Sequence, residues 1–299
     1  MRLRIGTRGS KLAMAQAREV AVRLAALGAE SELVAITTSG DRGVPSTASP
    51  AGAKGLFVAE IVRALQDGEV DLAVHSAKDL PSEDPTGVVV GAVPQRADPL
   101  DVLVTREESV GEGAVVGTSA LRRRAQLARS RPELRVRELR GNVDTRLRKL
   151  AEGEVDAVVL AAAGLARLGI VPEHWTPLPL DEMVPAPGQG ALAVQARGGD
   201  RTVLDIVRQV DDERSRAAFE AERAVVAAVG GGCALPLGAY AEQRAEGVRV
   251  LAVVIKPDGS DLVWAQTEAA TPSDAAAEAA TTLLSGGAAE ILAEVRAAS

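Results

Sequence analysis

The chain is poor in the residues that most often mark a metal site or a covalent framework. Its 299 residues include one Cys, two His, two Trp, one Tyr and two Phe. A single cysteine excludes an internal disulfide, and this set of His and Cys is too small and scattered for a zinc site of ordinary ligand spacing. The sequence therefore predicts no metal cofactor, and cores built from Ala, Val and Leu.

Long hydrophobic segments are also missing. No apolar run approaches the ~20 residues that a membrane span needs, and no signal-peptide-like segment follows the first residues, MRLRIG. The composition, 46% hydrophobic and 25% charged, is typical of a globular protein in water. We therefore expect a cytoplasmic protein without membrane attachment, divided into two or three domains because of its length.

Positive charge is concentrated in one segment of an acidic chain. Residues 118–149 contain eleven Arg or Lys and three Asp or Glu, a local charge of +8, so with a total of −7 the remainder carries −15. Such a segment predicts an anionic ligand, although a solvated helix face is the ordinary alternative. Nucleic acid is not expected, because the pI is about 5.1 and no aromatic residues interleave with the arginines.

Short apolar runs alternate with helical patterns through the first two thirds of the chain. This alternation predicts an α/β fold with mostly parallel sheets. The expected strands are residues 3–7, 33–38 and 70–75, the expected helices are 10–27 and 56–66, and residues 41–55 are expected to form a mobile loop. The last third changes character and predicts a small α+β domain: a helix over 211–229, strands over 248–255 and 262–267 around the turn PDGS, and two closing Ala-rich helices.

Two stretches of the chain look alike. The strand ending in IGT at residues 5–7 resembles VGT at 116–118, and GEVDLAV at 68–74 resembles GEVDAVV at 153–159, in the same order. Chance similarity in an Ala/Val-rich chain and an internal duplication explain these matches about equally well. If the duplication is real, two similar domains face each other across a cleft.

Several polar residues stand where such a cleft would form. Arg8 and Ser10 follow a strand at the start of a helix, and so do Thr118 and Ser119 before Arg122, Arg123 and Arg124, which are positions that suit an anion. Lys78 and Asp79 follow a buried strand, where ligands of open α/β sheets bind, or alternatively form an ordinary ion pair of a loop. His75 is expected to be a hydrogen-bonded core residue. Cys233, in a Gly-rich loop, is either a small buried side chain or a nucleophile.

Taken together, these segments resemble the porphobilinogen deaminase family, from Arg4 to at least Tyr240. The resemblance depends on eight motifs in the right order: residues 6–13 (GTRGSKLA), 54–57 (KGLF), 74–81 (VHSAKDLP), 117–123 (GTSALRR), 139–147 (LRGNVDTRL), 162–169 (AAGLARLG), 188–191 (GQGA) and 231–240 (GGCALPLGAY). Asp144 is a small departure, because it places a carboxylate inside an arginine motif.

The resemblance implies two periplasmic-binding-protein-like (type II) domains around a cleft and a small α+β C-terminal domain. The implied boundaries are residues 1–94 with 191–210 for domain 1, 95–184 for domain 2, 185–190 for a return linker and 211–299 for domain 3. It also implies a monomer that acts as a hydroxymethylbilane synthase in tetrapyrrole and haem biosynthesis. Four porphobilinogen molecules are joined head to tail with loss of ammonia onto a dipyrromethane primer, and water then releases the product.

The resemblance further implies a role for each matching residue. Cys233 carries the dipyrromethane through a thioether, and Asp79 is the catalytic carboxylate. Cofactor binding falls to Lys78, Ser76, Thr118, Ser119, Arg122, Arg123 and Arg167; substrate binding falls to Arg8, Ser10, Gln16, Arg140, Arg146 and Gln189; and Lys54 and Phe57 belong to a lid.

Two other classes of function remain possible from the residues alone. A non-catalytic two-lobed anion-binding module explains the arginines but gives Asp79 and Cys233 no joint role. A cysteine acyl transferase needs a histidine beside Cys233, and only His75 and His174 are available.

Overall fold

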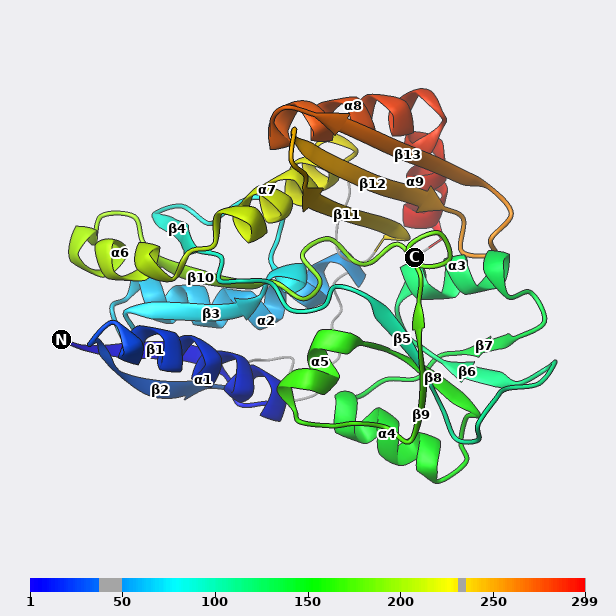
Figure 1. Cartoon of the computed structure of the whole chain (residues 1–299), viewed down its shortest axis with the longest axis horizontal. Coiled ribbons are helices and arrows are strands. Elements are labelled where there is room, and N and C mark those ends of the chain that lie inside the picture. Colours follow the sequence, from blue (N-terminus) through cyan, green and yellow to red (C-terminus); the bar gives the residue numbers. More distant parts are fainter. Residues whose placement is uncertain (38–49, 231–234, 299) are drawn as a thin grey trace.

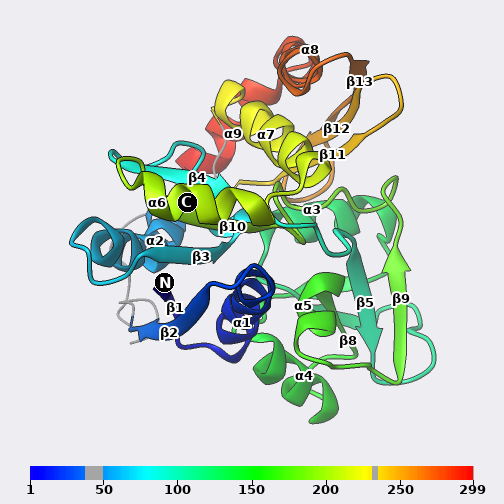
Figure 2. The ribbon, with the colours of Figure 1, turned by 60° about the vertical axis from the view of Figure 1, so that its left-hand side comes forward.

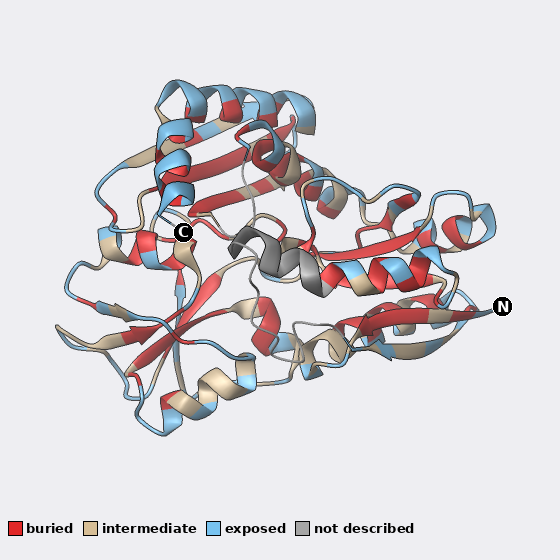
Figure 3. Ribbon diagram, turned by 180° about the vertical axis from the view of Figure 1, so that it is seen from behind, coloured by how far each residue is buried: buried red, intermediate tan, exposed pale blue. Residues whose placement is uncertain are grey.

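The computed structural model describes residues 1–37, 50–230 and 235–298, and for residues 50–57 it describes the backbone alone. Three sheets organise these residues, each with its own helices (Figure 1). Buried residues are concentrated in the central strands of the sheets, whereas the helices alternate between buried and exposed positions (Figure 3). Within the described part of the chain, no helix is both long and apolar enough to cross a membrane.

The first sheet is built from two separate parts of the chain. Its order is β2-β1-β3-β10-β4; β1 is parallel to β2 and β3, whereas β10 is antiparallel to both of its neighbours. The strands are β1 (Arg2–Arg8), β2 (Glu30–Ile36), β3 (Leu72–Ser76), β4 (Val88–Ala92) and β10 (Leu192–Arg197). Helices α1 (Lys11–Ala26) and α6 (Arg201–Val207) pack on one face and α2 (Pro50–Gln66) on the other.

The second sheet repeats this arrangement. Its order is β7-β6-β8-β5-β9, in which β6 is parallel to β7 and β8, and β5 is antiparallel to both of its neighbours. The strands are β5 (Asp101–Thr105), β6 (Val115–Gly117), β7 (Arg135–Arg137), β8 (Ala157–Ala161) and β9 (His174–Leu178), and the helices are α3 (Leu121–Ser130), α4 (Val143–Ala151) and α5 (Ala162–Arg167). The two sequence matches fall on β1 with β6 and on β3 with β8, which occupy equivalent places. The two similar α/β halves that these matches predicted are therefore present.

The third sheet belongs to the last third of the chain. It is an antiparallel meander of β11 (Leu237–Gln243), β12 (Val248–Ile255) and β13 (Leu262–Ala269). Helices α7 (Glu213–Ala228), α8 (Pro272–Ser285) and α9 (Ala288–Ala297) bury one face of it in an Ala- and Val-rich core. A short 3₁₀ turn, η2 (Arg208–Val210), precedes α7. The fold class is as expected, α/β with two sheet-centred halves and a small third domain. The first two sheets are mixed rather than mostly parallel, because β10 and β5 run antiparallel to their neighbours.

Most predicted elements are present, with differences at their ends. Ser10 caps α1 as predicted, because its hydroxyl accepts a hydrogen bond from the backbone N–H of Ala13 at 3.3 Å. The strand predicted over 33–38 is β2, which begins at Glu30 because it pairs with the whole of β1. The loop prediction for 41–55 is wrong at its end: α2 begins at Pro50, which suits a first turn, and continues through helix-forming alanines. Residues 38–49 lie outside the described part.

The chain passes from the first sheet to the second after β4 and returns before β10. Both of these crossings contact one buried carboxylate. Arg96, which follows β4, donates to both carboxylate oxygens of Glu222 on α7, at 2.6 and 3.2 Å. Glu222 is fully buried and also accepts hydrogen bonds from the backbone N–H groups of Gly188, at 2.5 Å, and Ala241, at 2.7 Å. This single carboxylate therefore joins both crossings to the third domain, which Figure 2 shows above them.

Candidate active site

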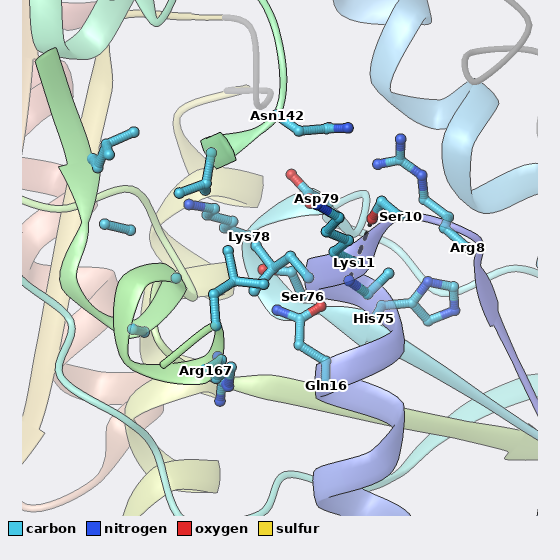
Figure 4. A pocket seen from close by; sticks show the side chains of 18 of the residues that line it. Arg8, Ser10, Lys11, Gln16, His75, Ser76, Lys78, Asp79, Asn142 and Arg167 are labelled. Atoms are coloured by element: carbon cyan, nitrogen blue, oxygen red, sulfur yellow. Dashed lines mark hydrogen bonds between the residues drawn. The ribbon is translucent and has the colours of Figure 1, made fainter. Parts of the chain in front are cut away.

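A cavity of about 220 Å³ lies between the first two sheets, and both contribute to its walls. The segments that follow β1 and β3 line one side, and α4, α5 and the segment before α4 line the other. These positions are the carboxyl ends of parallel strands, where open α/β sheets bind ligands. Figure 4 shows the polar side chains that meet there.

Asp79 lies in this cavity as predicted. It ends the short 3₁₀ turn η1 (Ala77–Asp79) directly after β3, and Ser76 and Lys78 line the cavity beside it. No described residue donates a hydrogen bond to its carboxylate, which is half-buried. Asp79 can therefore accept hydrogen bonds from a ligand.

His75 is the last buried residue of β3 and also lines the cavity. Burial lowers the pKa of its imidazole to about 4, against the opposing charge of Asp79. Its Nε2 atom is buried without a hydrogen-bond partner among the described residues. His75 is thus neutral at physiological pH, and the predicted hydrogen bond of a core histidine is not found at Nε2.

Two arginines from the second sheet face Asp79 across the cavity. Arg123 comes from α3 and Arg146 from α4. Burial, with the positive charge of Arg123, lowers the pKa of Arg146 to about 10. Among the described residues, Arg146 donates only to neutral groups, the carbonyl of Gly141 at 2.8 Å and the hydroxyl of Ser119 at 3.2 Å. The pair therefore has a net positive charge that suits a carboxylate ligand.

Arg122 and Arg123 share one buried counter-ion that the sequence did not reveal. Asp101, at the start of β5, accepts from Arg122 Nη2 at 2.6 Å and from Arg123 Nε and Nη2 at 3.1 and 2.7 Å. Burial alone would raise the pKa of Asp101, but the two guanidinium charges hold it below its ordinary value. Arg122 also donates to the carbonyl of Val184 at 2.6 Å and does not line the cavity, whereas Arg123 does.

The α1 side of the cavity contains the other predicted polar residues. Arg8, Ser10 and Gln16 line it as predicted, and Lys11 lines it without having been predicted. Lys11 pairs with Asp144 of α4 at 3.3 Å, so Asp144 binds a lysine of the opposite wall rather than a neighbouring arginine. Arg167 lies at the other end of the pocket from Asn142 (Figure 4).

Besides Arg122, four more of the predicted residues lie outside the cavity walls. Arg140 is exposed and pairs with Glu138 at 2.6 Å, whereas Thr118 is buried behind the cavity. Ser119 reaches the site only through Arg146. Gln189 is fully buried between the two halves, where its amide accepts from Lys78 Nζ at 3.3 Å and donates to Asp101 at 3.0 Å. No described contact shows these four binding a ligand.

Cys233, Lys54 and Phe57 lie outside the residues whose side chains the structure describes. Among the described residues, no group of three or more His, Cys, Asp or Glu could hold a metal ion. The residues that sequence reasoning missed are Asp101, Lys11 and Asn142. Lys11 and Asn142 stand within the quoted motifs, but nothing in the sequence near Asp101 signals its role.

A polycarboxylate cofactor fits this cavity. Arg123 and Arg146 offer it excess positive charge from one wall, and Lys78 and Arg8 lie on the other. Asp79 adds a carboxylate that no described donor satisfies. The donor set is therefore suited to a ligand with several carboxylates and N–H groups.

Comparison with known proteins gives a consistent result. Residues 3–205 match the family model "Porphobilinogen deaminase, dipyromethane cofactor binding domain", and residues 217–285 match "Porphobilinogen deaminase, C-terminal domain". The chain is 44% identical over 299 residues to porphobilinogen deaminase of Brevibacillus brevis, covering 98% of the chain and 97% of the relative. It is 47% identical to porphobilinogen deaminase of Rubrobacter xylanophilus, covering 99% and 98%.

Among solved structures, similar chains include substrate-binding proteins of transporters. One is an amino acid ABC transporter substrate-binding protein of Streptococcus pneumoniae bound to L-arginine, with a TM-score of 0.41 and 16% identity over 70% of this chain and 86% of that one. Another is a periplasmic substrate-binding protein of an ABC transporter from Coxiella burnetii, with a TM-score of 0.41 and 16% identity over 70% and 91%.

Proposed function

The chain belongs to the porphobilinogen deaminase family, and from this premise we propose how its described residues carry out the reaction of a hydroxymethylbilane synthase. The enzyme is a transferase of tetrapyrrole biosynthesis that condenses porphobilinogen units with loss of ammonia. A dipyrromethane cofactor, when bound, supplies the pyrrole onto which new units are added. We propose that Cys233 holds it through a thioether.

The assignment of roles rests on Asp79, whose carboxylate accepts no hydrogen bond from a described residue and lies among several cations. Asp79 lies in the same cavity as Arg8, Lys78, Arg123 and Arg146. Loss of ammonia from porphobilinogen leaves a cation that is electron-poor at its methylene carbon. In this proposal, the carboxylate of Asp79 accepts hydrogen bonds from pyrrole N–H groups and stabilises this charge as it develops. Asp79 also offers an acceptor for the proton that the ring loses after bond formation.

The arginines bind the carboxylate arms of the substrate and of the growing chain. Each added unit brings an acetate and a propionate arm, so negative charge accumulates in the cavity as the chain grows. Arg123 and Arg146 bind these arms from one wall, and Arg8 and Lys78 from the other. Asp101 holds Arg123 in place by accepting hydrogen bonds from its Nε and Nη2 atoms. Gln16, a buried residue of α1, lines the same cavity and adds an amide that can bind a substrate.

Replacing Asp79 by asparagine tests the central role. The asparagine side chain keeps the size of the aspartate and loses its charge, so we expect product formation to fall roughly 100-fold or more, as when one electrostatic stabiliser is removed, with little change in KM. Hydroxymethylbilane formation in a stopped assay measures this. Asp67→Asn, at an exposed position after α2, is the control. Near-normal turnover of Asp79→Asn would show that Asp79 does not act in the reaction.

We further propose that the enzyme acts as a monomer in the cytoplasm. The single cysteine and the composition support the compartment. Light scattering of the purified holoenzyme at several concentrations tests the oligomeric state: a mass near 30.8 kDa is expected, and a concentration-dependent mass near twice that value would contradict it.

A further inference from the structure

Two ion pairs join α1 of the first half to the opposite wall of the cavity. Lys11 pairs with Asp144 at 3.3 Å, and Glu19 Oε2 accepts from Arg167 Nε at 2.9 Å. The first pair lies in water, with Lys11 80% exposed, whereas the Arg167 side chain is only 7% exposed. Water and salt therefore screen the Glu19–Arg167 pair much less. Figures 1 and 2 both show α1 beside α5, which carries Arg167.

Arg167 presents two different edges. Its Nε binds Glu19, and Nη2 donates to the carbonyl of Gly190, which immediately precedes Ala191 and β10, at 3.0 Å. No described residue accepts a hydrogen bond from Nη1, although Arg167 lines the same cavity as Asp79 and Arg123. Nε and Nη2 are thus held by Glu19 and Gly190, whereas Nη1 has no acceptor among the described residues and can donate to a ligand carboxylate.

Glu19 has a second cation within reach on its own helix. Its Oε1 accepts from Arg23 Nη2 at 3.2 Å, one turn further along α1. Glu19 can therefore release Arg167 without being left as an unpaired carboxylate. Leu12 and Gln16, two of the α1 residues that line the cavity, lie on the same face of the helix as Glu19, which therefore follows the cavity lining along α1.

We propose that Glu19 competes with the carboxylates of the growing pyrrole chain for binding to Arg167. While the cavity holds few carboxylates, Glu19 neutralises Arg167 and keeps the two halves together. As units are added, a substrate carboxylate takes over Arg167 and Glu19 keeps Arg23 as its partner, so the contact between α1 and α5 loosens as the cavity fills. This inference rests on the proposed function, because it requires a ligand whose charge increases during the reaction. Glu19 is a positioning residue and takes no part in bond formation.

Glu19→Gln in the holoenzyme tests the proposal. The Gln amide oxygen can still accept from Arg167 Nε, so the variant should fold, but the competing charge is gone. We expect KM for porphobilinogen to fall about threefold at low salt, as for the loss of a partly exposed ion pair, and the difference from wild type to shrink at high salt. Intact mass spectrometry during turnover should show a larger fraction of enzyme carrying three or four added units, because they are held more tightly.

A second variant should change KM in the opposite direction. Arg23→Gln removes the alternative partner of Glu19, so Glu19 should remain on Arg167, and KM should rise about threefold. Glu32→Gln, which breaks the exposed pair with Arg2 far from the cavity, is the matched control and should leave KM and the adducts unchanged.

Different results would contradict the role of Glu19 and the proposed function. If Glu19→Gln makes hydroxymethylbilane with the KM and adduct distribution of wild type, Glu19 is only a structural contact and the inference is wrong. A raised KM in Glu19→Gln would likewise overturn it, because Glu19 would then assist Arg167 rather than compete. If wild-type protein makes no hydroxymethylbilane, the proposed function itself fails.

Discussion

Asp101 is the shared counter-ion of Arg122 and Arg123, the two adjacent arginines at the start of α3. Its carboxylate is fully buried and accepts three hydrogen bonds from Arg122 and Arg123. Arg122 uses its other described bond on the carbonyl of Val184, so it ties α3 to the return crossing. Arg123 is held by the same carboxylate but borders the cavity. Two neighbouring residues of one basic motif thus have different surroundings, which the sequence pattern alone could not separate.

Removing the Asp101 charge should be costly. In Asp101→Asn, two buried guanidinium groups lose their shared counter-ion, and we expect the free energy of unfolding to fall by about 3 to 5 kcal/mol. Urea unfolding of the variant and wild type measures the change. Asp205→Asn, which breaks an exposed pair with Arg208, is the control and should change stability by less than ~1 kcal/mol. An Asp101 variant as stable as this control would contradict the role.

His75 predicts a pH dependence of stability. Its pKa falls from 6.5 to about 4 on folding, so the unfolded chain binds its proton more readily. The stabilisation is complete above pH 6.5 and is lost as the pH falls toward 4, by about 3 kcal/mol in total. Unfolding curves between pH 7 and 4 for wild type and His75→Gln isolate this contribution, because the slope should be reduced in the variant. His174→Gln, at a half-exposed position, is the control. Identical slopes for His75→Gln and wild type would contradict the assignment.

Among the elements, the sequence predicted those whose signal is local. Ser10 before α1 and the turn between β12 and β13 are correct, because a cap and a tight turn depend on a few neighbouring residues. β11 was not predicted: its run LGAYAEQ is short and rich in small residues, and pairing with β12 decides its conformation. The start of α2 was missed because Gly and Pro in the segment suggested a loop.

The sequence identifies Gly188–Gln189–Gly190 as part of a family motif, but it does not predict the conformation or the contacts of this segment. Both glycines have positive φ, and a side chain at Gly190 would overlap the carbonyl oxygen of Ala97. Close contact with the backbone of the first crossing therefore requires glycine at this position. The purpose of the motif is visible only in the fold, where Gln189 contacts Lys78 and Asp101.

We expect Gly190→Ala to lower the free energy of unfolding by at least ~2 kcal/mol, because strain and a backbone clash act together. Thermal or urea unfolding detects the loss. Gly199→Ala, with open space around the new methyl group and no positive φ, is the matched control. Equal stability of the two variants would show that the crossing can shift without cost.

At the scale of the whole molecule, the site exists only because distant segments meet. Asp79 and Arg146 are far apart in sequence but line one cavity, since the chain crosses to the second sheet and returns as β10. The alternation of strands and helices and the internal repeat predicted two facing halves. Neither could predict the ion pairs between them, such as Glu19 with Arg167, because side-chain partners across an interface leave no periodic signal in either segment.

We propose that this cavity builds a tetrapyrrole on a primer held by Cys233. Intact-protein and peptide mass spectrometry of the purified enzyme tests it most directly. We predict a mass increase equal to two linked, deaminated porphobilinogen units, located on the peptide that contains Cys233, with further single-unit increments after addition of porphobilinogen. A Cys233 peptide that stays unmodified after incubation with porphobilinogen, with no hydroxymethylbilane formed, would contradict the account.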